Sequence, residues 1–323
     1  MADKLASWTE KLLQELAAGR SCCLVLLAET RGSTPREAGT VMLAGLPDEE
    51  PDEAPDELGK LLAGTVGGGE LEYQLLAEAG RLLAGQPDSF SRTRRDYPLG
   101  PALGQCCGGS VRAVLEIWPP AQLPALQALL ADRPGWLAHG EADNSLPAAH
   151  AKDSPRPPVA SQPFTRRVPF YLYGAGHVGR AVMAITGDLP LDRYWIDTGE
   201  SRFPADMDAS ITRLVARDPA HIARYAESGA IHLVMSYSHA LDQAICHRVL
   251  KQDDFFRLGL IGSATKRARF ESRLAAAGFS ETQLARLVCP IGLADIPGKD
   301  PAFLALSVAG QIAVWLAEQE APS

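Results

Sequence analysis

The sequence feature that most constrains the fold is a glycine-rich turn that joins an apolar segment to a helical one. Residues 168–173 are almost wholly apolar and predict a buried strand, and Gly174-Ala-Gly176-His-Val-Gly179 follows directly. In such a turn the first glycine permits a tight bend, the second lets backbone approach a pyrophosphate, and the third lets helix pack on strand. Asp197 ends the next predicted strand about 20 residues further on, where a ribose-binding acid is expected. The pattern predicts a Rossmann-like fold.

The chain is predicted to form two α/β domains. Strand and helix signals alternate through residues 168–323, which favours a Rossmann-like domain with a mainly parallel sheet. Residues 1–139 predict an N-terminal mixed α/β domain, because apolar helical periods alternate there with short apolar runs. Between them, residues 140–167 contain five prolines and no apolar period, which indicates an extended interdomain linker.

These signals place individual elements. Helices are expected at 3–18, 121–131, 177–185, 241–251, 264–277 and 302–318, with another following residues 67–69. Strands are expected at 22–28, 39–44, 61–66, 111–118, 168–173, 194–197, 231–236 and 258–261.

Composition narrows the class of protein. The net charge of −8 argues against nucleic acid as a partner and provides no basic face for a membrane surface. No uninterrupted apolar run reaches the ~18 residues of a membrane span, and the N-terminus lacks a signal-peptide core. We therefore expect a cytoplasmic protein. Residues 47–57 hold seven acids and three prolines, which predicts a solvated loop.

The adjacent thiols Cys106 and Cys107 are the candidates for chemistry in the first domain. They lie in Gly104-Gln105-Cys-Cys-Gly108-Gly109, and glycines at these spacings let backbone approach a ligand closely. Thiolate sulfur prefers soft metals and sulfur-rich cofactors, which favours a binding loop. The alternative is a glycine-rich turn with two core thiols. The other four cysteines, at positions 22, 23, 246 and 289, are most simply core thiols.

Two further segments of the first domain could bind an anion. Gly67-Gly68-Gly69 precedes a helix that carries Glu70 and Glu72, and it resembles a phosphate cradle without the lysine of a P-loop. Arg36 follows Ser33-Thr34-Pro35 and could clamp an anion through its guanidinium. A sharp corner and a surface arginine remain the alternatives.

In the second domain, polar residues follow two predicted strands. His177 opens the helix after the glycine turn, and His239 with Asp242 could form an acid–base pair. Lys266 and Arg267 could face an anion or water. An NAD(P)-dependent oxidoreductase would use Gly174–Gly179, Asp197 and His239, and would leave the cysteine loop without a role.

Six motifs in order resemble one known family. They are Gly32-Ser-Thr-Pro-Arg36, Gly64-Thr-Val-Gly-Gly-Gly-Glu-Leu-Glu72, Gly104-Gln-Cys-Cys-Gly-Gly109, Gly174-Ala-Gly-His-Val-Gly179, Gly262-Ser263 with Lys266-Arg267, and Pro290-Ile-Gly-Leu293. Together they look like the XdhC family of xanthine dehydrogenase accessory proteins, over nearly the whole chain.

The resemblance implies a maturation chaperone more than a turnover enzyme. Such proteins bind molybdenum cofactor, a molybdopterin whose dithiolene holds molybdenum and whose tail ends in phosphate. They keep it while a cysteine desulfurase provides the terminal sulfido ligand, and deliver it to apo xanthine dehydrogenase. Partnership with molybdenum cofactor biosynthesis proteins and homo-oligomerisation are expected on the same ground.

The resemblance also implies site residues. It assigns the essential thiol and molybdenum contact to Cys107, with Cys106 second. It places the cofactor-binding set near that thiol, a set comprising Gln105, Gly108, Gly109, Arg36, Gly67, Gly68, Gly69 and Glu72. A sulfur carrier on Cys107 is a further reading.

The chain departs from the family pattern in places. Residues 47–57 look like an insertion, Thr198-Gly199 follow Asp197 where an acid and an arginine are usual, and Ser236-Tyr237 replace a more usual Thr-His. These changes leave open whether Gly174, Gly176, His177, Gly179 and Asp197 bind NAD(P), another nucleotide or phosphate.

Overall fold

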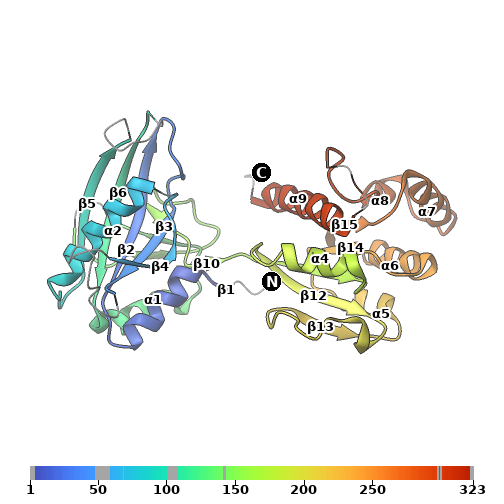
Figure 1. Cartoon of the computed structure of the whole chain (residues 1–323), viewed down its shortest axis with the longest axis horizontal. Helices are drawn as coiled ribbons and strands as arrows, with labels where there is room; N and C mark the ends of the chain where they lie inside the picture. The colour runs from blue at the N-terminus through green and yellow to red at the C-terminus, as the bar shows by residue number, and fades with distance from the viewer. Residues whose placement is uncertain are drawn as a thin grey trace. The chain divides into compact units, whose positions relative to one another are not determined.

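The computed structural model describes residues 4–47, 59–67, 69–99, 108–140, 143–296, 298 and 300–320. The chain divides into two compact units, with the division between Thr165 and Arg166. Both units combine helices and strands, which confirms the predicted α/β class (Figure 1). Of the acidic stretch 47–57, all but Pro47 lies outside the described residues.

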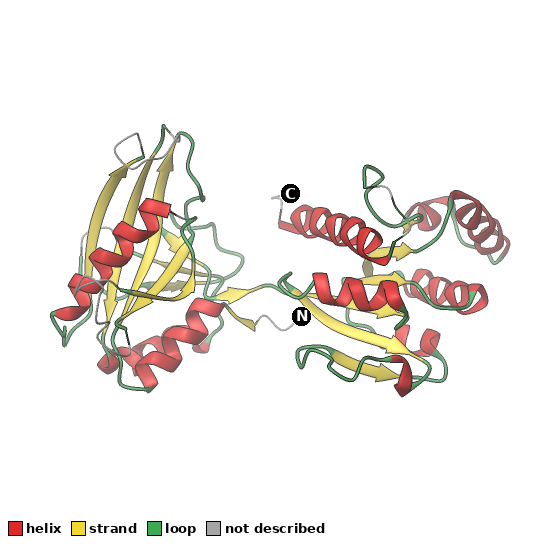
Figure 2. Ribbon diagram, in the orientation of Figure 1, coloured by secondary structure: helices red, strands yellow, loops and turns green. Residues whose placement is uncertain are grey.

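An antiparallel five-stranded sheet forms the centre of the first unit, in the order β4-β3-β2-β6-β5 (Figure 2). Its strands are β2 (Cys22–Arg31), β3 (Val41–Gly45), β4 (Lys60–Gly64), β5 (Ser91–Pro98) and β6 (Ser110–Trp118).

Both faces of this sheet are covered, which explains the continuous apolar run in β2. Side chains alternate between the faces of a strand. Cys23, Val25 and Leu27 pack in one cluster with α2 (Gly69–Ala84). Cys22 and Leu24 pack in another with α1 (Ser7–Ala17) and α3 (Leu123–Ala131).

Strand β5 was not predicted, because half of its sequence, Ser-Arg-Thr-Arg-Arg-Asp-Tyr-Pro, is charged. It lies at the edge of the sheet, where one side of a strand can face water. Its buried Arg92 donates from Nε to Oε1 of Glu116 on β6, at 2.8 Å. The buried Arg92 thus anchors β5 to β6 through an ion pair.

Residues 143–165, predicted as part of a linker, belong to the first unit. They form β8 (Ala148–His150), β9 (Ala160–Ser161) and β10 (Phe164–Thr165). Strands β8 and β9 flank β7 (Trp136–Ala138), and β10 pairs with β1 (Lys4–Leu5). Such short strands pair through backbone hydrogen bonds, so neither the prolines nor the missing apolar period prevents them.

A buried polar network attaches this segment to the main sheet. Glu116 Oε1 lies 2.8 Å from Nδ1 of His139, whose Nε2 lies 2.8 Å from Oγ of Ser161. Trp118 donates from Nε1 to the other Glu116 oxygen at 3.2 Å. Burial alone would raise the pKa of Glu116, but His139 and Arg92 hold this pKa below its usual range.

The second unit is built on a six-stranded parallel sheet in the order β13-β12-β11-β14-β15-β16. The strands are β11 (Val168–Tyr173), β12 (Leu191–Asp197), β13 (Thr212–Val215), β14 (Ala230–Val234), β15 (Phe255–Leu260) and β16 (Leu287–Val288). The first three strands run outward in one direction and the last three in the other. This is the doubly wound order of a Rossmann fold.

Helices cover both faces of the parallel sheet. The helices are α4 (His177–Ile185), α5 (Pro219–Ala223), α6 (His239–Gln252), α7 (Ala264–Ala276), α8 (Glu281–Ala285) and α9 (Pro301–Glu320). Phe170 and Leu172 of β11 pack in a cluster with α4 and α9, whereas Tyr171 and Tyr173 pack in a cluster with α5, α6 and α7.

Helix α9 alone among the described helices is long and apolar enough to cross a membrane, judged by length and composition. Its residues Val308, Ile312 and Trp315 are buried in the same cluster as the core of α4. A core helix passes the same test, so this is weak evidence for a membrane span.

Replacing Glu116 with alanine would remove the buried carboxylate partner of Arg92 and leave it, among the described residues, only the exposed carboxylate of Asp143 at 2.8 Å. Removing one partner of a buried ion pair costs about 3–5 kcal/mol. We expect Glu116→Ala to lower the free energy of unfolding of the first unit by about that amount, measured by urea titration of the full chain followed by circular dichroism.

Glu29→Ala is the matched control for this substitution. Glu29 also contacts two arginines, Arg31 at 2.6 Å and Arg112 at 2.5 Å, but at the surface, where water screens the charges. A similar loss in the two variants would contradict a structural role for the buried network.

Candidate functional site

Three segments predicted to bind a cofactor meet at one end of the first sheet. We call them the three-loop site: the turn Gly32–Arg36 after β2, the corner at 65–69 between β4 and α2, and Gly108-Gly109 before β6. A Cβ atom on Gly109 would lie 2.4 Å from the carbonyl oxygens of Arg31 and Ser33. One on Gly67 would lie 2.7 Å from Cγ of Arg36. Only glycine at these two positions allows the segments to approach so closely.

Two other glycines of the three-loop site face open space. Among the described residues, no heavy atom beyond the chain neighbours lies within 4 Å of where a Cβ would stand on Gly69 or Gly108. Gly69 has a φ of +65°, in the left-handed region that favours glycine. Backbone at both positions is therefore accessible to a ligand.

Glu72 holds the corner of the three-loop site in shape. Its Oε2 accepts hydrogen bonds from Oγ1 of Thr65 at 2.5 Å and from the backbone N–H of Val66 at 3.2 Å. The N–H of Gly67 donates in turn to Oγ1 of Thr65 at 3.1 Å. The Glu72 carboxylate is thus engaged within the protein, and its predicted contact with a cofactor stays a prediction.

Arg36 of the three-loop site has a guanidinium that faces solvent. Its side chain is exposed, and no hydrogen bond or ion pair joins its guanidinium to the part of the chain that the structure describes. The neighbouring Arg31 is paired with Glu29 at 2.6 Å, and Arg112 with Asp96 at 2.9 Å. Arg36 can therefore accept an anion without breaking an internal contact.

The predicted thiols Cys106 and Cys107 lie outside the described residues, as do Gln105 and Gly68. In the sequence, Cys107 directly precedes Gly108 of the three-loop site. Their assignment as ligands stays a prediction.

The four other cysteines are buried, which confirms their assignment as core thiols. Burial raises the pKa of Cys22 to about 12 and raises the pKa values of Cys23, Cys246 and Cys289. None of the four supplies a thiolate at neutral pH.

The glycine turn of the second unit matches the roles expected from its spacing. A Cβ on Gly174, which has a φ of +124°, would lie 2.4 Å from the carbonyl oxygen of Met235, and one on Gly179 would lie 2.2 Å from that of Gly174. Gly176 has no such neighbour within 4 Å and is exposed, as is His177. Two glycines therefore serve packing, and the middle one leaves backbone open.

Asp197 is not free to bind a ribose in this structure. Its Oδ2 accepts from the N–H of Ala175 at 2.7 Å and its Oδ1 from the N–H of Thr198 at 2.6 Å. Nε of Arg202 lies 3.2 Å from the same Oδ1. Asp197, which was predicted to bind a ligand, instead joins the glycine turn after β11 to the end of β12 through its hydrogen bonds.

The predicted acid–base pair of His239 and Asp242 is not formed. Asp242 is fully buried and accepts from the N–H and Oγ of Ser236, and its Oδ2 lies 2.7 Å from Nζ of Lys266. His239 is the exposed first residue of α6, behind the cap Ser238. His239 and Asp242 therefore do not form the acid–base pair that the alternative oxidoreductase function would use.

The side chains of Lys266 and Arg267, which were predicted to face an anion or water, both contact other groups of the protein. Lys266 also donates to the carbonyl oxygen of Ile261 at 2.8 Å, and Arg267 contacts Glu271 at 2.7 Å. Among the described residues, no group of three His, Cys, Asp or Glu side chains is placed to hold a metal ion.

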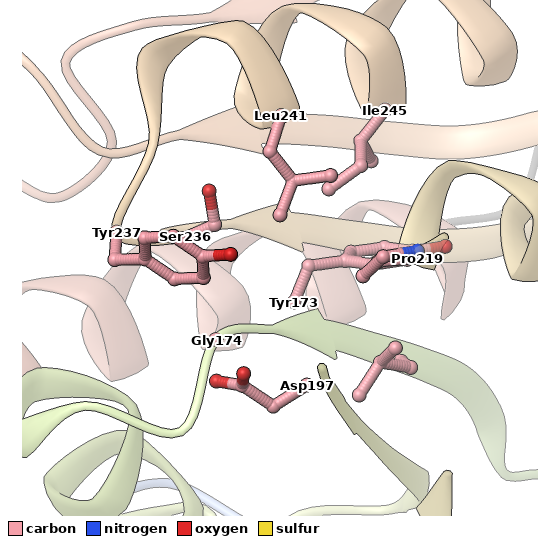
Figure 3. Close-up of a pocket in the computed structure, with 9 residues that line it drawn as sticks. Tyr173, Gly174, Asp197, Pro219, Ser236, Tyr237, Leu241 and Ile245 are labelled. Atoms are coloured by element: carbon pink, nitrogen blue, oxygen red, sulfur yellow. The ribbon is translucent and has the colours of Figure 1, made fainter. Parts of the chain in front are cut away.

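A tight crevice, too small to admit a water molecule, lies at the carboxyl ends of the central strands of the second unit. Its lining includes Tyr173, Gly174, Asp197, Ser236 and Tyr237. Figure 3 shows the Asp197 carboxylate beside Gly174, with the ring of Tyr237 across the crevice. The sequence analysis did not single out Tyr237 or Arg202 as site residues. An arginine five residues after the strand-ending acid was the available signal.

Comparison with known proteins gives matches in both units. The model described as the XdhC Rossmann domain matches residues 170–312, and that of the XdhC and CoxI family matches residues 15–95. A protein of Escherichia coli (strain K12), YqeB, described as uncharacterized, is 22% identical over 287 residues. That alignment covers 88% of this chain and 42% of YqeB, so the chain spans less than half of the relative's length.

A solved structure has a similar fold. The structure, from Bacillus halodurans and described as a xanthine dehydrogenase, has a TM-score of 0.72 and 17% sequence identity, and the match covers 97% of each chain. At this identity the likeness shows the fold alone.

Adjacent glycines provide a test of the three-loop geometry. An alanine methyl at 109 would meet two backbone carbonyl oxygens that cannot rotate away, whereas one at 108 would meet nothing within 4 Å. Overpacking of this kind costs about 1–3 kcal/mol. We expect Gly109→Ala to speed hydrogen exchange in residues 31–36, measured by mass spectrometry, and Gly108→Ala to leave it unchanged. Equal exchange in the two variants would contradict the contact.

Proposed function

Because the chain belongs to the XdhC and CoxI family, we propose that it is a maturation factor for xanthine dehydrogenase. In this proposal it binds molybdenum cofactor, holds it while a cysteine desulfurase supplies the terminal sulfido ligand, and delivers it to the apo enzyme. Proteins of molybdenum cofactor biosynthesis would supply the cargo, and the chain would act as a homo-oligomer in the cytoplasm.

The observation that carries the proposal is the meeting of three distant segments at Gly109 and Gly67. The turn at 32–36, the corner at 65–69 and the segment before β6 are separated in sequence but lie in contact at one end of the sheet. Packing alone does not require the open backbone at Gly69 and Gly108. The open backbone beside these contacts supports a role in binding a ligand.

The residues present fit the two ends of the proposed cargo. The exposed guanidinium of Arg36 and the open backbone at Gly69 suit a phosphate, which arginine binds through paired N–H donors. The thiols of Cys107 and Cys106, joined in sequence to Gly108, suit the molybdenum–sulfur end, since soft sulfur ligands favour such metals. Glu72 contributes by holding the corner that carries Gly67.

Electrostatics favours the same assignment of roles. A thiol becomes a ligand when a nearby positive charge stabilises its thiolate. Burial raises the pKa values of the four buried cysteines, whereas the three-loop site contains Arg36, which has no charged partner among the described residues. We assign the essential thiol to Cys107 and the supporting one to Cys106.

The first test is the loss of cofactor in a thiol variant. We expect Cys107→Ala to purify folded but without molybdopterin, which is measured as its fluorescent oxidation product per mole of protein. Cys106→Ala is the matched control and should retain most of the pterin. Wild-type pterin content in Cys107→Ala would contradict the assignment, and a protein persulfide on Cys107 after incubation with a desulfurase would favour a sulfur carrier.

The second test concerns the phosphate. Arg36→Gln removes a charge that contacts no described partner, so we expect unchanged thermal stability. Loss of one charge-assisted contact should weaken pterin binding by about tenfold. Arg94→Gln, on the exposed part of β5, is the control for a general charge effect. Equal weakening in both variants would contradict a specific role for Arg36.

A further inference from the structure

The crevice of the second unit lies at the point where the strand order of its sheet reverses. The chain passes from β11 outward to β12 and β13, then returns to β14 on the other side of β11. Ligands of open α/β sheets bind at this point, outside the carboxyl ends of the strands. Tyr173 and Gly174 from the end of β11, Asp197 from β12 and Tyr237 after β14 line the crevice (Figure 3). We call it the switch-point crevice.

The acid of the switch-point crevice has little capacity left for a ribose diol. Asp197 is 4% exposed, and both of its oxygens already accept backbone N–H bonds, from Ala175 and Thr198. Arg202 adds an ion pair to Oδ1 at 3.2 Å. A 2′-hydroxyl would have to displace one of these contacts before it could bind.

Two arginines, Arg202 and Arg180, lie at the mouth of the crevice, and unlike Asp197 they are exposed. The Arg202 guanidinium lies 4.3 Å from the centroid of the Tyr237 ring, and the side chain is 43% exposed. Arg180 donates from Nη2 to the carbonyl oxygen of Arg202 at 2.7 Å and from Nε to that of Ala175 at 3.3 Å. Both contacts of Arg180 are to neutral carbonyls, so its charge is not cancelled.

Two acids near these arginines, Glu200 and Asp197, already form ion pairs. Glu200 pairs with Arg213 at 3.0 Å, and Asp197 pairs with Arg202. Of the two arginines, Arg202 is thus paired with a carboxylate and Arg180 contacts carbonyl oxygens, in a chain whose net charge is −8. This local excess of positive charge favours a dianionic group.

We propose that the exposed surface at the mouth of the switch-point crevice binds an adenine nucleotide whose ribose carries a 2′-phosphate, and that Arg202 determines this specificity. In Rossmann domains an acid after the second strand accepts from a 2′-hydroxyl, whereas an arginine there accommodates a 2′-phosphate. Here the acid is occupied and the arginine has N–H donors to spare. The exposed, planar surface formed by Arg202 and Tyr237 suits stacking of the adenine. This proposal goes beyond the maturation role and does not depend on the three-loop site.

The proposal is tested by calorimetric titration of the full chain with NADP⁺ and with NAD⁺. We expect NADP⁺ to bind at least about tenfold more tightly, the value of one charge-assisted contact. 2′-AMP should compete with NADP⁺ and 5′-AMP should not, which separates a 2′-phosphate from any phosphomonoester, including the tail of a pterin cofactor. Equal affinity for the two dinucleotides, or no binding of either at about 1 mM, would overturn the proposal.

The specificity residue is tested by Arg202→Ala. This change removes the phosphate partner, whereas Oδ1 of Asp197 still accepts from the N–H of Thr198. We therefore expect the preference to fall at least about tenfold, through weaker NADP⁺ binding. Arg213→Ala, which breaks the neighbouring pair with Glu200, is the control and should keep the preference. Unchanged NADP⁺ binding in Arg202→Ala would overturn the assignment.

A conservative variant separates specificity from folding. Arg202→Lys keeps the charge beside Asp197 but loses the planar fork, and should give an intermediate preference with a wild-type circular dichroism melt. Cys107→Ala should bind NADP⁺ as wild type does, so failure of the maturation role and failure of this proposal are distinguishable.

Discussion

The structure depends on close backbone approach at a few glycines, where any side chain would collide with a carbonyl oxygen. Gly109 lies against Arg31 and Ser33, and Gly174 lies against Met235. Each contact joins segments that are far apart in sequence and so sets the position of a loop at a strand end. Because a backbone carbonyl cannot rotate away as a flexible side chain can, these contacts leave the loops few alternatives. Candidate sites in both units are built beside such contacts.

Charged side chains near the candidate sites fall into two groups: acids that hydrogen-bond within the protein, and arginines with exposed N–H donors. Glu72, Asp197 and Asp242 each accept backbone or hydroxyl hydrogen bonds, and two of them also pair with a cation. These acids hold loops in place and are poor candidates for acid–base chemistry. Arg36 and Arg202 retain exposed donors, so the surfaces beside them favour anions. In each unit an exposed arginine thus belongs to the candidate site.

Elements with a strong apolar pattern were predictable, and elements stabilised by polar contacts were not. The runs at 22–28 and 168–173 became β2 and β11, buried on both faces. Strand β5 carries four charged residues, and the strands between residues 148 and 165 are only two or three residues long; all of them were missed. Their stability comes from backbone pairing and from Glu116, Arg92 and His139, whose side chains are distant in sequence. No local window contains that information.

The sequence by itself determined the α/β class, the Rossmann turn at Gly174–Gly179 and the glycine motifs of the first unit, because period and spacing are local properties. It also indicated that Cys22, Cys23, Cys246 and Cys289 would be core thiols, and all four are buried. Only the tertiary structure decided that Asp242 contacts Lys266 and not His239, and that Asp197 binds the turn beside it. Which partner a charged side chain takes depends on distances across the fold, and sequence spacing does not encode those distances.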